Sequence, residues 1–121
     1  MENLTDIRQA LRHFAQERDW DQFHSPKNLA MALSVEASEL LEHFQWLNEA
    51  QSNDLDDETW NQVQDEIADV QVYLVRIADK LGIDILEAVA QKMKKNRQKY
   101  PPDKVRGSSK KYTAYTDVED Q

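Results

Sequence analysis

The sequence predicts an all-α protein with four main helices. Apolar residues recur at three- and four-residue spacings over long stretches of the chain, which is the period of an α-helix. Only two glycines and three prolines occur among 121 residues, and they fall at expected helix ends or in the tail. A chain of this length needs one domain, residues 1–121, with a helical core over about residues 1–100 and a tail over residues 101–121 that is first basic and then acidic.

The first helix is expected over about residues 5–18, with Thr5 as its N-cap. Ile7, Leu11 and Phe14 recur at helical spacing and form its apolar face. The connection that follows, residues 19–24, carries two aromatic rings and an imidazole, which we interpret as a lid over the core.

The second helix is expected to begin at Ser25 and to end near residue 46 or 47. Ser25 can accept hydrogen bonds from the first free amides, and Pro26 occupies the first-turn position that needs no N–H. Glu36 takes the place of a leucine in an apolar stripe, and Glu39 follows one turn later. Because burying an ionised carboxylate costs several kcal/mol, we expect a positive group near Glu36. The stripe consists of Leu29, Leu33, Leu40 and Leu47.

The third helix is the most regular and is expected to end at Gly82. A polar stretch over residues 48–57 precedes it, which we expect to be an exposed loop that ends at an aspartate cap. Glu66 and Asp69 lie one turn apart beside the apolar seam of this helix, and so repeat the acidic pair of the second helix. The seam consists of Trp60, Val63, Ile67, Val70, Leu74, Ile77 and Leu81.

The fourth helix is expected to begin at Asp84, which matches a capping box with Glu87, and to end at Tyr100 before two prolines. Nine of the fifteen Lys and Arg residues lie between Lys92 and Lys111, although the whole chain carries a net charge of −8. An acidic centre with a basic end suits a polyanionic ligand that is bound with a divalent metal. The net charge argues against nucleic acid and membrane surfaces as partners.

The chain contains no cysteine, which excludes a disulfide framework, a thiolate metal site and a cysteine nucleophile. Its first residues do not form a basic segment followed by an apolar one, and no apolar run is long enough to cross a membrane. A cytoplasmic location is therefore the default expectation.

The two acidic pairs predict a metal centre between the second and third helices. If these helices pack antiparallel, Glu36, Glu39, Glu66 and Asp69 can assemble around one point. Other acid pairs share the three-residue spacing, so only their place beside apolar seams distinguishes these four from acids that border a core or a subunit interface. Hard oxygen donors, without Cys or a Glu-x-x-His pair, favour Mg²⁺ or Mn²⁺. Since substrate phosphates usually complete the shell of Mg²⁺, the pattern indicates phosphoanhydride chemistry.

The motifs around these acids resemble those of the MazG-like all-α nucleoside triphosphate pyrophosphohydrolases, and within that family the branch that acts on dCTP. The matching runs are residues 23–29 (FHSPKNL), 36–40 (EASEL), 44–46 (FQW), 65–70 (DEIADV) and 73–74 (YL). Further matches are KM at 92–93, NR at 96–97, YP at 100–101 and SSKKY at 108–112. The resemblance implies a helical bundle completed by oligomerisation, as a homodimer or homotetramer, that converts a nucleoside triphosphate into its monophosphate and pyrophosphate.

The resemblance also implies roles for individual residues. The four acids would hold magnesium, and one of them, with Glu39 as the first choice, would take the proton of the attacking water. Leu11 departs from the pattern, because a polar residue is expected there in the animal enzymes. The wall of the base pocket would be formed by Trp20, His24, Trp46 and Tyr73. The phosphates would lie near Lys92, Asn96, Arg97, Tyr100, Lys110 and Lys111.

Two alternatives to the house-cleaning hydrolysis of dCTP or a modified dCTP stay open. A related pyrophosphohydrolase that acts on dUTP or phosphoribosyl-ATP uses similar acidic motifs, and a panel of substrates separates the two. A non-catalytic helical interaction module would carry acids that only decorate an interface. On that interpretation Mg²⁺ and dNTPs leave the thermal stability unchanged, and Glu36→Gln is harmless.

Overall fold

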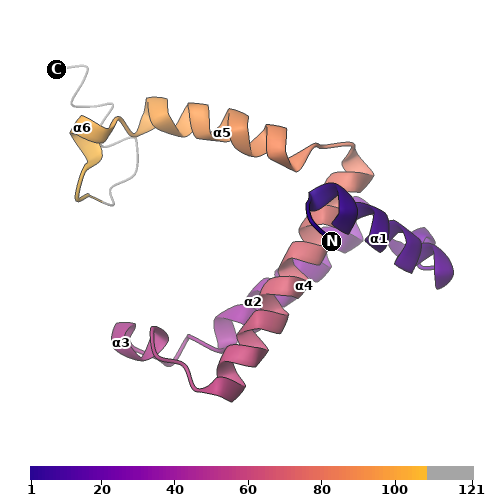
Figure 1. Cartoon of the computed structure of the whole chain (residues 1–121), viewed down its shortest axis with the longest axis horizontal. Helices are drawn as coiled ribbons and strands as arrows, with labels where there is room; N and C mark the ends of the chain where they lie inside the picture. Colours follow the sequence, from indigo (N-terminus) through magenta and orange to yellow (C-terminus); the bar gives the residue numbers. More distant parts are fainter. Residues whose placement is uncertain (109–121) are drawn as a thin grey trace. The chain divides into compact units, whose positions relative to one another are not determined.

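The computed structural model describes residues 1–108, and within them the regular secondary structure is entirely helical (Figure 1). The four long helices confirm the predicted all-α class. By its internal contacts the chain divides into two compact units, the first ending at Ile83 and the second beginning at Asp84. The elements are α1 (Leu4–Glu17), η1 (Asp21–Phe23), α2 (Pro26–Glu42), α3 (Glu49–Ser52), α4 (Asp57–Leu81), α5 (Ile85–Lys99) and α6 (Pro102–Val105).

The two N-terminal helices begin at side-chain caps, one of which differs from the prediction. Ser25 caps α2 as expected, because its Oγ accepts from the amide of Asn28 at 3.1 Å. α1 begins earlier than predicted, since Asn3 and not Thr5 is its cap; Asn3 Oδ1 accepts from the amide of Asp6 at 2.8 Å. α2 ends at Glu42, and residues 43–46 form turns where the prediction continued the helix.

The predicted ends of α4 are confirmed. Asp56 is the aspartate cap, with its Oδ1 accepting from the amide of Thr59 at 2.8 Å. Gly82 closes the helix in the left-handed conformation, with φ of 68°. The polar stretch before α4 is not a simple loop, because Asn48 and Gln51 form a capping box that starts the short helix α3.

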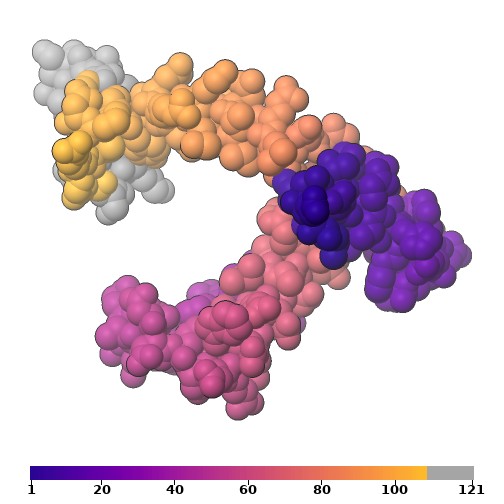
Figure 2. Space-filling view, viewed as in Figure 1, coloured from indigo at the N-terminus to yellow at the C-terminus, as the bar shows by residue number. Residues whose placement is uncertain are grey.

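The core of the first unit lies where α2 and α4 run side by side in opposite directions (Figure 1). α1 packs on the C-terminal end of α4, where Arg12 Nε donates to Asp79 Oδ2 at 2.7 Å, whereas α3 lies at the opposite end of α4 (Figure 2). The buried apolar side chains among the described residues are Ala15, Leu29, Val63, Val75 and Ala78.

The apolar seam predicted for α4 is only partly buried, and in this respect the prediction was wrong. Val63 is 8% exposed, but Trp60, Ile67 and Leu81 are 55–56% exposed. The reason is that α1 covers a different face of the helix at its C-terminal end, where Val75 and Ala78 are buried. Much of the three–four repeat therefore has no covering element within the first unit.

The second unit starts as predicted, with the carboxylate of Asp84 accepting from the amide of Glu87 at 3.0 Å. α5 ends at Lys99 with Tyr100 as its C-cap, and the short helix α6 lies in the region expected to be tail. Within the described range, no helix is both long and apolar enough to cross a membrane.

Candidate metal centre and adjoining pocket

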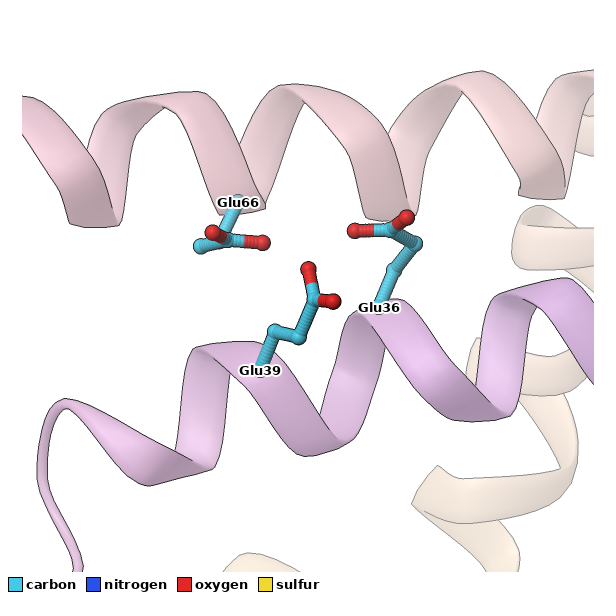
Figure 3. A group of neighbouring side chains, drawn as sticks. All are labelled: Glu36, Glu39 and Glu66. Carbon is cyan, nitrogen blue, oxygen red and sulfur yellow. The ribbon is translucent and has the colours of Figure 1, made fainter.

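Three carboxylates converge between α2 and α4. Glu36 and Glu39 reach across from α2, and Glu66 faces them from α4 (Figure 3). Each residue offers one oxygen, and these atoms all lie within 4.8 Å of one another. The three-residue spacing places Glu36 and Glu39 on one face of α2, and the antiparallel packing brings Glu66 opposite them.

The cluster is short of positive charge. Burial is the largest cause that raises the pKa of Glu36, which reaches about 7. The neighbouring carboxylate of Glu39 is the next cause, and the charges of Asp69 and Glu66 act in the same direction. The pKa of Glu66 is raised by burial and then by Glu39 and Asp69, while His43 opposes the shift. Glu36 Oε2 and Glu66 Oε2 are both buried, and within residues 1–108 neither has a hydrogen-bond partner.

No Lys or Arg of the first unit supplies the positive group expected near Glu36, since none of them forms an ion pair with the cluster. Within that unit His43 is the basic side chain at the cluster, with its Nε2 3.9 Å from Glu66 Oε1. Unpartnered carboxylate oxygens at this spacing match the donors that Mg²⁺ and Mn²⁺ prefer. The residues therefore fit a divalent cation.

Asp69, the fourth predicted ligand, lies beside the cluster. It is exposed, and it does not belong to the group of oxygens within 4.8 Å. Its charge nevertheless raises the pKa of Glu36 and Glu66, and its side chain lines an adjoining pocket. Asp69 therefore connects the acidic cluster with this pocket.

The adjoining pocket has a volume of about 360 Å³ and contains three of the four predicted base-binding residues, Trp20, His24 and Tyr73. Trp20 is held by an edge-to-face contact with Phe14, at 5.8 Å between ring centroids. Trp46, the fourth, lies in the turns after α2 with 87% of its surface exposed, outside the pocket. The remaining residues that line the pocket are Leu11, Phe14, Ala15, Asp69, Val72 and Arg76.

Four of the predicted phosphate-binding residues lie in the described part of the second unit. Lys92, Asn96 and Arg97 lie on α5, and Tyr100 is its C-cap. Lys110 and Lys111 lie outside the described residues.

Two residues of the site were missed from the sequence. His43 follows Glu39 by four residues, so the helical spacing already placed it on the acidic face. Arg76 follows Tyr73 by three residues on the line that contains Glu66 and Asp69, and it is only 4% exposed. The spacing placed both residues near the site, but it gave no sign of how deeply Arg76 is buried.

Comparisons with known proteins show which family the chain resembles. The model of the MazG-like family matches residues 31–114. dCTP pyrophosphatase 1 of Rattus norvegicus is 44% identical and that of Homo sapiens 43% identical, each over 115 residues that cover 91% of this chain. The chain spans 66% of the length of these relatives. A pyrophosphatase from Archaeoglobus fulgidus has a similar crystal structure, with a TM-score of 0.78 and 39% identity over 84% of this chain and 94% of that one.

Proposed function

This chain belongs to the MazG-like family, and on that premise we propose that it hydrolyses dCTP or a modified dCTP to the monophosphate and pyrophosphate. One observation carries the proposal: a cluster of three carboxylates lies next to an aromatic-lined pocket, with Asp69 at their junction. The relatives named dCTP pyrophosphatase 1, at 42–44% identity, support this substrate. The activity is the removal of unwanted nucleotides from the deoxynucleotide pool.

Mg²⁺ is the proposed cofactor, with Mn²⁺ as a substitute. Glu36, Glu39 and Glu66 would hold it, with Asp69 at the side of the pocket. When bound, the cation supplies neutralisation of phosphate charge and a lower pKa for coordinated water. The unpartnered oxygens of Glu36 and Glu66 are the support for this assignment.

The protein's own groups have separate tasks in the proposed reaction. Water attacks the α-phosphorus, the bond to the bridging oxygen breaks, and pyrophosphate leaves. Glu39 takes the proton of the water. Trp20, His24 and Tyr73 hold the base, since aromatic rings stack on a pyrimidine and an imidazole can bond to its edge. Binding of the base at one end and of the phosphates at the other orients the α-phosphorus for attack.

Six polar and basic residues of the C-terminal part of the chain are proposed to bind the phosphates. They are Lys92, Asn96, Arg97, Tyr100, Lys110 and Lys111. A homodimer or homotetramer is proposed as well, because large apolar side chains on α4 remain exposed in the described chain. The cytoplasmic location and the absence of nucleic acid or membrane partners stay predictions.

The test is to incubate the protein with Mg²⁺ and each common dNTP, dUTP and phosphoribosyl-ATP in turn, and to resolve all products. We expect dCMP and pyrophosphate from dCTP at the highest kcat/KM. Preferential hydrolysis of dUTP or phosphoribosyl-ATP would support the proposed type of reaction but show that dCTP is not the preferred substrate. No turnover of any compound would indicate a non-catalytic interaction module.

Glu36→Gln tests the acidic cluster in the same assay. It should lower kcat by roughly a hundredfold or more, because several kcal/mol of charge stabilisation in the transition state is lost. Glu42→Gln is the matched control, since Glu42 lies on the same helix with an exposed side chain outside the cluster. Equal activity of Glu36→Gln and Glu42→Gln would show that the acidic cluster takes no part in the reaction.

A further inference from the structure

Arg76 is the one buried charged residue among residues 1–108, at 4% exposure. Its guanidinium lies between three partners. Nη2 is 3.0 Å from Asp21 Oδ1 and 3.1 Å from His24 Nδ1, and Nη1 is 3.6 Å from Asp79 Oδ2. Arg76 is therefore fixed against two carboxylates and one imidazole, at the wall of the pocket proposed for the base.

The contact with Arg76 determines where His24 carries its proton. A guanidinium has five donors and no acceptor, and it stays protonated in proteins. It can bond to Nδ1 of His24 only if Nδ1 accepts, so the proton of the neutral ring must be on Nε2. Burial and then the charge of Arg76 lower the pKa of His24, with Lys80 in the same direction and Asp21 opposing. The ring of His24 is therefore mainly neutral near pH 7.

The other ring nitrogen of His24 is available to a ligand. Within the described residues Nε2 has no hydrogen-bond partner, and it is not one of the fully buried polar atoms. His24 lines the pocket together with Trp20 and Tyr73. A base that stacks in this pocket therefore meets the Nε2–H donor of His24, and Arg76 is the residue that keeps the proton on this nitrogen.

We propose that Arg76 is a positioning residue that keeps His24 as a hydrogen-bond donor, and that this donor selects cytosine over uracil and thymine. Cytosine has an acceptor at N3, whereas N3 of uracil and thymine carries a proton. Where the Nε2–H donor meets N3 of the base, uracil and thymine place a second donor against it, and both donors are left unpaired at a cost in binding free energy. The inference rests on the proposed function, and it adds the device by which that site recognises the base.

The tautomer is tested directly by NMR on the full chain labelled with ¹⁵N-histidine. Three histidines contribute signals, and His24→Gln identifies those of His24. We expect the pattern of a neutral ring protonated at Nε2, with Nδ1 unprotonated, in the absence of nucleotide. Arg76→Met removes the donor to Nδ1 and should redistribute the proton between the two nitrogens. A wild-type ring protonated at Nδ1, or an unchanged pattern in Arg76→Met, would overturn the proposal.

Base selection is tested by kcat/KM for dCTP and dUTP. Arg76→Met removes the donor to Nδ1 and should lower the dCTP-to-dUTP ratio roughly tenfold or more, because the ring can then present either nitrogen form. Lys80→Gln is the matched control, since Lys80 Nζ lies 2.6 Å from the same Asp21 Oδ1 and makes no contact with His24. The control should keep the wild-type ratio.

Other outcomes of the kinetic test count against the proposal in different ways. If Arg76→Met slows both substrates equally, or if Lys80→Gln changes the ratio as much, Arg76 has only a structural role. If the wild type hydrolyses neither nucleotide, the proposed function fails, whereas the NMR spectrum still confirms or refutes the tautomer. A variant that does not fold leaves the wild-type spectrum as the deciding measurement.

Discussion

Glu36 occupies a position of α2 that the surrounding leucines make apolar, and one of its carboxylate oxygens is buried without a partner in the described chain. The cost of ionising this group is the reason that its pKa rises to about 7. A cation bound here would recover that cost. The free energy of metal binding at this residue is therefore coupled to pH.

The affinity of the nucleotide-free protein for Mg²⁺ is expected to rise with pH. Below the pKa of about 7, binding must displace a proton from Glu36, so the affinity should increase up to about tenfold per pH unit and then level off. Calorimetric titrations in buffers of different ionisation enthalpy measure both the affinity and the released proton. An affinity that is independent of pH, without proton release, would show that Glu36 does not bind the metal.

Glu36 should also make the metal-free protein less stable as pH rises. A folded-state pKa raised above the unfolded value gives stability that is present below about pH 4.5 and is lost as pH rises through about 7. The pKa values of Asp21 and Asp79 are lowered from the ordinary value of 3.8. These two carboxyls therefore change the stability only at more acidic pH, outside this window. His24 acts in the opposite direction near pH 6.5, because its pKa is lowered.

Comparison of the wild type with Glu36→Gln isolates this contribution. Thermal unfolding in a chelator should show Tm of the variant exceeding that of the wild type at pH 8, with a smaller difference at about pH 5. His24 is the same in both proteins and cancels. A constant difference across this range would mean that Glu36 titrates normally in the folded state.

At the scale of helices, the start and end signals were more informative than the apolar repeats. Ser25, Asp56 and Gly82 act as the sequence predicted, because each needs only its own short-range geometry. The seam of α4 was misjudged because a three–four repeat identifies an apolar face but not the element that covers it. The end of α2 was misjudged for a related reason, since apolar residues continue past Glu42 into turns.

The choice between the two candidate caps of α1 can be tested by stability. Asn3→Ala should lower the free energy of unfolding by about 1 kcal/mol, because the amide of Asp6 loses its acceptor. Thr5→Ala is the matched control and should change it by no more than a few tenths of a kcal/mol, since Thr5 lies inside the helix with an exposed side chain. Urea unfolding measures both values. A larger loss for Thr5→Ala would restore Thr5 as the cap.

At the scale of the whole molecule, the exposed part of the α4 seam indicates that the first unit does not complete its core by itself. Trp60, Ile67 and Leu81 are more than half exposed within the first unit. Burying such side chains contributes about 25 cal/mol per Å² of apolar surface. A second copy is the proposed cover, which makes the oligomeric state part of the stability of the fold.

Ile67→Asp should therefore reduce the molecular mass measured by light scattering from that of the oligomer toward that of one chain, 14.2 kDa. A charge in an apolar interface is left unpaired and desolvated, which opposes association. Asn61→Asp adds the same charge to an exposed position of α4 on the side away from the seam, and it should leave the mass unchanged. A wild-type protein that is already monomeric would refute the proposed oligomer.

The acidic cluster was largely predictable from the sequence, whereas its surroundings were not. Glu36, Glu39 and Glu66 could be found because helix periodicity and antiparallel packing bring them together. The hydrogen bond from Arg76 to His24 joins residues that are 52 positions apart, and no local pattern encodes it. Trp46 lies outside the pocket because the chain leaves the helix at Glu42, a boundary that propensity does not determine.

The most direct test of the proposed reaction is hydrolysis of dCTP in ¹⁸O-enriched water with Mg²⁺, followed by mass spectrometry of both products. Attack at the α-phosphorus places one ¹⁸O atom in dCMP and none in pyrophosphate, and Glu36→Gln should abolish the labelled product. Label in pyrophosphate, release of orthophosphate, or full activity of Glu36→Gln would show that the cluster does not direct water to the α-phosphorus.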